Sequence, residues 1–183
     1  MGNFKIVELN IIANADKEAV WDLTFNRFGE VNNFNPLIEG SHFTSMDKGE
    51  VGCERQCDLD LKGNHLTERI IDAQGHDSFE LEIIGGSMPM MDKMFVKQEF
   101  KEIGPNKTAI KLTVRFKSKP AFMAPIMGMM MKRMLFGMLL GLKYHLETGE
   151  MVTKENIKAI KRAYSGLREG KAFSGLGVGS LAA

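Results

Sequence analysis

Arg55 and Glu68 are the two residues of this sequence whose types and positions could do chemistry. Arg55 lies in segment 51–61, where polar side chains at every second position share the solvent face of a strand: Glu54, Gln56, Asp58 and Asp60. The opposite face therefore carries Arg55 inward, together with two cysteines and Leu59. A buried guanidinium can hold the carboxylate or hydroxyl of a ligand in an apolar pocket.

Glu68 is expected near Arg55, on the strand that follows the turn Lys62-Gly63-Asn64. An unpaired buried charge is very costly, so each of the two residues needs a partner. Two structural explanations stay open: Arg55 pairs with Glu68, or Glu68 faces outward and Arg69 inward. As functional groups, Arg55 and Glu68 would orient the polar end of a ligand. In an enzyme they would polarise a carbonyl and move a proton, and no other residue is predicted to be catalytic.

The cysteines and histidines indicate neither a metal site nor a cofactor. Cys53 and Cys57 share a strand face, but at a rise of about 3.3 Å per residue they are too distant to form a disulfide. We interpret them as buried free thiols of a reducing, cytoplasmic environment. The histidines are dispersed without zinc-like spacing: His42, His65, His76 and His145. His145 suits the end of a helix, where a cation complements the helix dipole, better than a catalytic role.

The overall composition is that of an ordinary globular chain. Of its 183 residues, 44% are apolar and 26% charged, and the net charge of +1 gives no reason to expect a nucleic-acid partner. The sequence contains no glycine-rich nucleotide-binding motif, and its N-terminus lacks the basic-then-apolar pattern of a signal segment. Lys132 and Arg133 interrupt the one long apolar stretch, and each costs about 2.5–3.5 kcal/mol at a bilayer centre. No transmembrane segment is therefore predicted.

The elements that would position Arg55 and Glu68 follow from the alternation of apolar residues. A strand at 4–13 precedes a helix capped by Asp16 and a second short helix that ends at Asn35-Pro36. Six further strands follow, and the last four each have one apolar face: Leu66 and Ile70; Phe79, Leu81 and Ile83; Met94, Val96 and Phe100; Ile110, Leu112, Val114 and Phe116. Tight turns between these strands predict an antiparallel meander whose apolar face must be covered.

Residues 120–149 predict one long helix, the only element long enough to cover that face. On a helical wheel, its Met-rich face contains Met127, Met130, Met131, Met134, Met138, Gly141, Leu142 and His145. A smaller apolar patch on the other side contains Phe136, Leu139 and Leu140. Because methionine adapts to irregular shapes, the Met-rich face either walls a ligand site or forms a soft core. The predicted fold is α+β: a curved antiparallel sheet of about seven strands wrapped around a long C-terminal helix, with two short helices after the first strand.

Four segments stand out by their order and spacing: Ile12-Ala13 with Val20-Trp21-Asp22; Phe28-Gly29-Glu30-Val31 with Phe34-Asn35-Pro36; Gly49-Glu50-Val51-Gly52-Cys53-Glu54-Arg55; and Leu66-Thr67-Glu68-Arg69-Ile70. Together they resemble the SRPBCC superfamily, which includes START domains, polyketide cyclases/dehydrases, birch-pollen-allergen-like proteins and plant abscisic-acid receptors. Phe34 departs from the Trp of many relatives but keeps an aromatic ring. The resemblance covers roughly residues 4–149 and implies the helix-grip fold, with a hydrophobic cavity between sheet and helix. It implies no particular chemistry.

The implied cavity would be lined by inward-facing residues of the sheet and the long helix. The predicted ligand-binding residues are Arg55, Cys57, Leu59, Leu66, Glu68, Ile70, Leu81, Ile83, Met94, Leu112, Val114, Met130, Met134 and Met138. Each apolar member taken alone is equally explained as plain core. Gly137 and Gly141 either leave volume or let a partner element approach the helix. The segment Met88-Pro89-Met90-Met91 is either a lid over the cavity or an ordinary hairpin.

The resemblance ends at Gly149, so we divide the chain into a ligand-binding domain, 1–149, and an appendage, 150–183. In the appendage, Thr153 can cap a helix with the apolar stripe Ile157, Ile160, Tyr164 and Leu167. This stripe is expected to cover the patch around Phe136, in the same chain or in a homodimer, and a membrane surface is the alternative partner. Residues 174–183 are predicted to be disordered.

Three classes of function are compatible with these features. The leading prediction is binding or transport of a small hydrophobic molecule, lipid-like or polyketide-like, with one polar end. The alternative is an enzyme of the polyketide cyclase/dehydrase type that uses Arg55 and Glu68. The third is a protein-interaction module, which requires a core filled by Met and Phe side chains.

Overall fold

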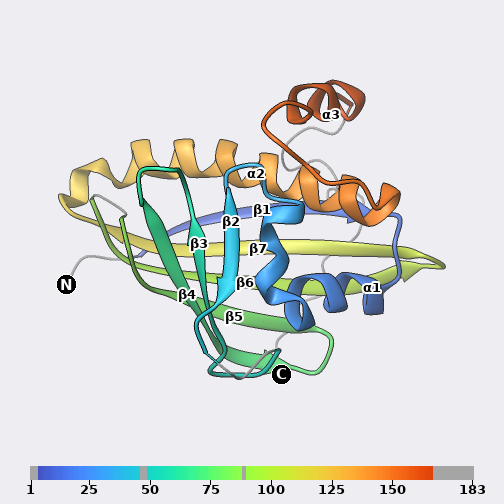
Figure 1. The fold of residues 1–183 in the computed structure, drawn as a ribbon, viewed down its shortest axis with the longest axis horizontal. Helices are drawn as coiled ribbons and strands as arrows, with labels where there is room; N and C mark the ends of the chain where they lie inside the picture. The colour runs from blue at the N-terminus through green and yellow to red at the C-terminus, as the bar shows by residue number, and fades with distance from the viewer. Residues whose placement is uncertain (1–3, 46–48, 88–89, 167–183) are drawn as a thin grey trace.

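The computed structural model describes residues 4–45, 49–87 and 90–166 (Figure 1). The strands are β1 (Lys5–Ala13), β2 (Gly40–Phe43), β3 (Glu54–Asp58), β4 (His65–Gln74), β5 (Ser78–Gly86), β6 (Met91–Gly104) and β7 (Lys107–Ser118). The helical segments are α1 (Lys17–Trp21), η1 (Asp22–Asn26), η2 (Phe28–Asn33), η3 (Ala121–Met123), α2 (Ala124–Thr148) and α3 (Ile157–Ala163). The predicted order of one strand, short helices, six strands and a long helix is confirmed.

The seven strands form one antiparallel sheet in the order β1-β7-β6-β5-β4-β3-β2. After the short helices, each strand pairs with the next one along the chain, and β1 returns to pair with β7. Figure 1 shows α2 running across the sheet, with α3 over the C-terminal half of α2, on the side away from the sheet. The predicted α+β fold, a sheet held against a long C-terminal helix, is confirmed.

The inward faces of the strands agree with the alternation in the sequence. On β7, Leu112 is 1% exposed, and Ile110, Val114 and Phe116 are completely buried. These residues pack in one core with Leu9 of β1 and with residues of β5, β6 and α2. Because successive strand residues point to opposite faces, this pattern also fixes which side of the sheet faces α2.

Strand β3 is shorter than the predicted 51–61. It starts only at Glu54 because Gly52, at φ +98°, turns the chain in a conformation that other residues rarely adopt. It stops at Asp58, because the Asp60 carboxylate accepts hydrogen bonds from the backbone N–H groups of Lys62 and Asn64, at 2.8 and 3.2 Å. The neighbouring strand β2 is also short and ends at Phe43.

The long helix α2 ends where the sequence indicates. Gly149 adopts the left-handed conformation at φ +74°, and its N–H donates to the carbonyl of His145 at 2.8 Å, a common helix end. The His145 ring lies 2.7 Å from the Glu150 carbonyl, at the same end. With the turn before it (Ala121–Thr148), α2 is the one helix in the described part of the chain that is long and apolar enough to cross a membrane. Its buried residues, however, belong to the core of this fold.

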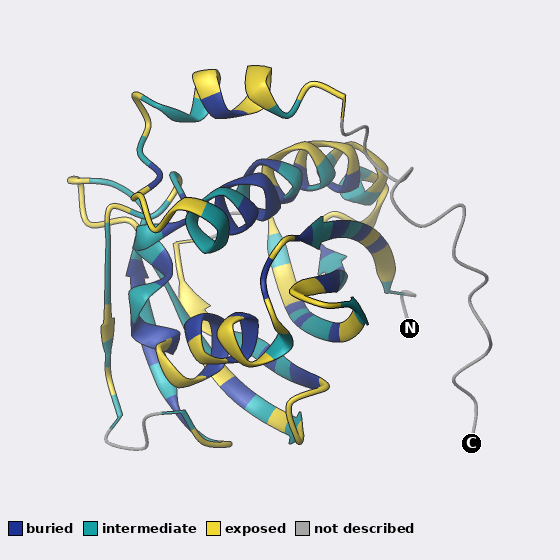
Figure 2. Ribbon diagram, turned by 90° about the vertical axis from the view of Figure 1, so that its right-hand side faces the viewer, coloured by how far each residue is buried: buried dark blue, intermediate teal, exposed yellow. Residues whose placement is uncertain are grey.

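The buried face of α2 differs from the predicted one. Met130, placed on the inner face by the helical wheel, is 66% exposed, whereas Leu135 is buried. Leu139 and Leu140, which the helical wheel placed on an outer patch to be covered in the same chain, in a homodimer or by a membrane, are 0% and 2% exposed within this one chain, so neither is available for a dimer or membrane contact. Figure 2 shows α2 passing from largely exposed to largely buried along its length. The helical-wheel argument supposed that only one side of the helix packs against other elements, but the C-terminal half of α2 is covered on two sides.

The second covering of α2 is made by the turn after η2 and by the chain beyond Gly149. A Cβ atom at Gly141 would collide with the backbone oxygen of Phe34 and press on Val152. The N–H of Val152 donates to the Asn33 carbonyl at 2.9 Å, which fixes the chain where it leaves α2. The absence of a side chain at Gly141 therefore lets the turn after η2 approach α2 closely, and it does not enlarge the cavity.

Helix α3 packs on α2 of the same chain, and a partly buried polar network joins its C-terminal cap to α2. The Tyr164 hydroxyl donates to Glu147 Oε2 at 2.8 Å, and the N–H of Asn14 donates to Glu147 Oε1 at 2.7 Å. Lys143, buried beside them, pairs with Glu147 and donates to the Ile12 carbonyl at 2.9 Å. The apolar stripe contributes Ile160, which is 4% exposed, while the predicted stripe residue Leu167 and residues 174–183 lie outside the described residues.

This network shifts the pKa of both acidic partners. Burial by itself would raise the pKa of Glu147, but hydrogen bonds from Lys143, Asn14 and Tyr164 together outweigh it and hold that pKa below its ordinary value. Burial and the hydrogen bond to Glu147 raise the pKa of Tyr164 to about 12. The carboxylate is therefore ionised and the phenol neutral at neutral pH.

Candidate ligand-binding cavity

A cavity of about 110 Å³ lies between the sheet and α2. Strands β3 to β7 form its floor, α2 forms its roof, and one side is closed by η2 and the turn after it. Its lining residues are Val31, Asn35, Leu37, Ile38, Arg55, Cys57, Leu59, Leu66, Glu68, Leu81, Ile83, Met94, Val96, Gln98, Leu112, Met134, Leu135 and Met138. The wall is therefore mostly apolar and contains only a few polar side chains, as is typical of ligand sites.

Most of the residues proposed from the sequence as cavity walls do line it. They are Arg55, Cys57, Leu59, Leu66, Glu68, Leu81, Ile83, Met94, Leu112, Met134 and Met138. Three proposed residues do not line it. Ile70 and Val114 are completely buried in the core, and Met130 lies on the exposed side of α2.

Arg55 and Glu68 face each other across β3 and β4. Glu68 Oε2 lies 2.5 Å from both Nε and the Nη2 nitrogen of Arg55. The remaining nitrogen, Nη1, donates to the Phe28 carbonyl, and the guanidinium stacks 3.7 Å from the centre of the Phe28 ring. The first structural explanation for the two charges is thus what the structure shows. The second is wrong, because Arg69 pairs with Glu54 on the other face of the sheet.

Comparisons with known proteins agree with this architecture. The major latex-like protein 151 of ginseng (Panax ginseng) superposes with a TM-score of 0.63 at 14% identity, over 79% of this chain and 98% of that one. A START superfamily protein from Mycobacterium smegmatis gives 0.59 at 15% identity, over 77% and 98%. This chain has the helix-grip fold. No family model and no curated protein sequence matches it.

The helix-grip fold is the one that the sequence resemblance implied, so that prediction is confirmed at the level of fold. The same fold also occurs in enzymes. Norcoclaurine synthase from Thalictrum flavum, solved with dopamine and hydroxybenzaldehyde, superposes with a TM-score of 0.61 at 12% identity, over 78% of this chain and 86% of that one. At such identities the fold is shared, and the function has to be argued from the cavity itself.

Three polar groups of the helix-grip cavity are available to a ligand. Among the described residues, Glu68 Oε1 has no hydrogen-bond partner and is not fully buried. The side-chain amide of Gln98, on β6, has no hydrogen-bond partner within the same part of the chain. The Asn35 Oδ1 accepts the N–H of Leu37 at 3.2 Å and shapes the turn, but the Nδ2 of the same side chain has no partner within the described ranges. Arg55 is fully engaged, since each of its three nitrogens has a partner.

Cys57 is a neutral group in this site. Its Sγ lies 3.5 Å from Glu68 Oε2 and 3.7 Å from the Ser41 hydroxyl. Burial, reinforced by the negative charge of Glu68, raises the pKa of the Cys57 thiol to about 12. A thiol that stays protonated at neutral pH is a poor nucleophile. Cys57 and the buried Cys53 are both free.

Several lining residues were not predicted, for two reasons. Strand alternation placed Val96 and Gln98 on the inward face of β6 with Met94, but neither was among the predicted ligand-binding residues. Leu135 was missed because the helical wheel was centred on the wrong side of α2. Val31, Asn35, Leu37 and Ile38 come from η2 and an irregular turn, for which no periodicity gives a direction.

Other predicted features lie away from the cavity or outside the described residues. Met90, at φ +65°, is 47% exposed, and Met91 opens β6, but neither lines the cavity. The rest of the predicted lid, Met88 and Pro89, lies outside the described residues. Within 4–45, 49–87 and 90–166, no group of three or more His, Cys, Asp or Glu could hold a metal ion.

Proposed function

We propose that this protein binds a small hydrophobic molecule carrying a hydrogen-bonding group in the cavity between the sheet and α2. The observation that supports this most directly is the combination of an apolar hollow with three polar groups that have no partner among the described residues: the Gln98 amide, Glu68 Oε1 and Asn35 Nδ2. None of the three is fully buried, so each is accessible to a ligand in the cavity, and a ligand that can hydrogen-bond to them is favoured over a purely apolar one. Arg55 would contribute by holding Glu68 in place.

The size of the cavity indicates a compact apolar body. An engineered protein cavity of about 150 Å³ accepts a benzene molecule, and the volume here is about 110 Å³. Met134 and Met138 in the roof are only partly buried, and methionine side chains repack readily. A single ring with a short alkyl chain, accommodated by repacking of these two methionines, is therefore the apolar body we propose.

Titration with phenylbutanol, a neutral probe with one ring and one hydroxyl, tests this function. We expect saturable one-to-one binding by calorimetry, and native mass spectrometry should show the same stoichiometry. Met138→Trp should abolish binding because the indole fills the cavity. Met130→Trp, the same change on the exposed side of α2, should leave binding intact.

Two results would contradict the proposal. One is the absence of saturable binding by the folded wild-type protein. The other is equal binding by the Met138→Trp and Met130→Trp variants, since the ligand would then lie elsewhere.

A second candidate function is proton transfer on a polyketide-like carbonyl substrate, of the cyclase or dehydratase kind. The observation that favours it is the free oxygen of Glu68, a carboxylate that lines the cavity and could act as a base. Turnover of a polyketide-like ketone by the wild-type protein and not by Glu68→Gln would support this candidate. Turnover by neither protein would leave the simple binder as the proposed function.

A protein-interaction role receives less support, because it requires a filled core and the cavity has measurable volume. We also propose a cytoplasmic location. The support is the pair of free cysteines, since thiols persist in reducing compartments.

A further inference from the structure

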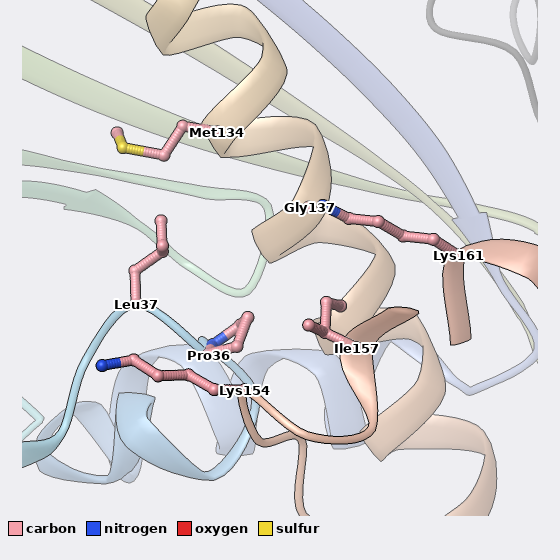
Figure 3. A pocket seen from close by; sticks show the side chains of 7 residues that line it. All are labelled: Pro36, Leu37, Met134, Gly137, Lys154, Ile157 and Lys161. Atoms are coloured by element: carbon pink, nitrogen blue, oxygen red, sulfur yellow. The ribbon is translucent and has the colours of Figure 1, made fainter. Parts of the chain in front are cut away.

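A second hollow adjoins the cavity on its outer side (Figure 3). It is a groove of about 170 Å³ between α2, α3 and the turn after η2, and its walls are Pro36, Leu37, Met134, Gly137, Lys154, Ile157 and Lys161. Three of these residues come from the chain beyond Gly149. The groove therefore exists only because α3 packs on α2.

Leu37 and Met134 line both the groove and the cavity, so these two side chains form the partition between them. Leu37 is 40% exposed and Met134 is 43% exposed, so neither is locked in the core. Figure 3 shows Met134 and Leu37 reaching toward each other from α2 and from the turn. A rotamer change of either side chain would join the two hollows.

The outer groove carries positive charge. Lys154 is paired with Glu39. Lys161 has no ion-pair or hydrogen-bond partner among the described residues, and its ammonium lies over Gly137, 3.2 Å from where a Cβ atom would stand. Figure 3 shows the Lys161 side chain extended from α3 toward Gly137. The missing side chain at Gly137 makes room for this free cation at the mouth of the groove.

We propose that the groove is the entrance of the cavity and that Lys161 binds a carboxylate at the outer end of the ligand. The apolar body would pass between Leu37 and Met134 into the cavity. This inference rests on the proposed function and adds a second polar group to the ligand, a carboxylate at its outer end, opposite the inner group that meets Gln98 and Glu68. A probe whose only polar group is a carboxylate is expected to place its ring in the cavity and that carboxylate at Lys161. It assigns the appended helix a part in ligand recognition, because α3 supplies Lys161.

Three probes with the same phenylbutyl body test the inference: phenylbutyrate, phenylbutanol and phenylbutylamine. For the wild-type protein at neutral pH and low salt, we expect phenylbutyrate to bind about three- to tenfold more tightly than phenylbutanol. The advantage should shrink as salt is added, because an exposed ion pair is screened. Lys161→Glu should remove it and favour the amine, while phenylbutanol binding stays unchanged.

Lys158→Glu is the matched control, because Lys158 is an exposed lysine of the same helix that does not line the groove. It should leave the preference for phenylbutyrate intact. Equal affinities for phenylbutyrate and phenylbutanol, or equal effects of the two lysine variants, would overturn the role of Lys161 while the proposed function stands. Absence of binding by all three probes would overturn the proposed function and this inference with it.

Discussion

Two arginine–glutamate pairs occupy neighbouring positions of β3 and β4 on opposite faces of the sheet. Arg55 lies opposite Glu68, and Glu54 lies opposite Arg69. In each pair a guanidinium nitrogen lies 2.5 Å from a carboxylate oxygen. The residue types, strands and contact distance are the same, so only the surroundings differ.

The surroundings change what each pair does. The side chains of Arg55 and Glu68 are 7% and 12% exposed, against 45% and 25% for Arg69 and Glu54. Water can replace a lost partner on the outer face, but a charge left alone on the inner face has nothing to solvate it. Neither member of the inner pair can therefore be removed alone without a large loss of stability, and the pair places a carboxylate in a cavity where one oxygen stays free.

The largest effect is expected when the inner pair is broken. Arg55→Leu should lower the free energy of unfolding by about 3–5 kcal/mol, because Glu68 is left on the inner face without its partner. Urea denaturation measures this. The double variant Arg55→Leu/Glu68→Leu should recover most of the loss, since an apolar pair leaves no buried charge. If the double variant were as unstable as the single one, shape and not charge would explain the loss.

A smaller effect is expected in a third pair, Lys143–Glu147, in which both carboxylate oxygens have partners. At neutral pH, Glu147→Gln should cost about 1.5–3 kcal/mol, the range for hydrogen bonds to charged groups. The folded pKa of Glu147 lies below its ordinary value of 4.5, so the ionised group stabilises the fold above that value. This contribution disappears as pH falls through the folded pKa.

Urea denaturation of the wild-type and Glu147→Gln proteins between neutral and acidic pH would test this sign. The stability difference should be constant at neutral pH and shrink in acid. Tyr164→Phe should reproduce part of the neutral-pH loss, because it removes one donor to the same carboxylate. A difference that persisted unchanged in acid would show that the charge of Glu147 contributes nothing.

The smallest effect is expected on the outer face. Arg69→Leu should change the free energy of unfolding by no more than about 1 kcal/mol, since exposed ion pairs contribute little. Phenylbutanol affinity should be unchanged, because Arg69 does not line the cavity. A loss comparable to that of Arg55→Leu would mean that pairing across these strands matters more than burial.

The inward position of Arg55 could be predicted from the sequence because strand alternation is local. Glu54, Gln56 and Asp58 favour the solvent face, and the alternation of a strand then places the residues between them on the inner face. The same reasoning identified the inner faces of β5, β6 and β7. The fold class could also be predicted, because a sheet with one apolar face and a single long helix can pack together in only a few ways.

The errors occurred where burial depends on contacts distant in sequence. Whether Met130 or Leu135 of α2 is buried depends on which elements cover the helix, and its own periodicity gives only an apolar side. Lys161 appeared in the sequence only as a charge beside an apolar stripe. Its place at the groove depends on Gly137, which lies on another helix.

Gly141 has a consequence for redesigning the binding site. The Phe34 carbonyl occupies the space that a side chain at position 141 would need. The C-terminal half of α2 is therefore held at a fixed distance from the turn that follows η2. The Met134–Met138 region has no such constraint, and it forms the roof. An engineer who wants a larger ligand should therefore shorten side chains at Met134 and Met138 and treat Gly141 as invariant.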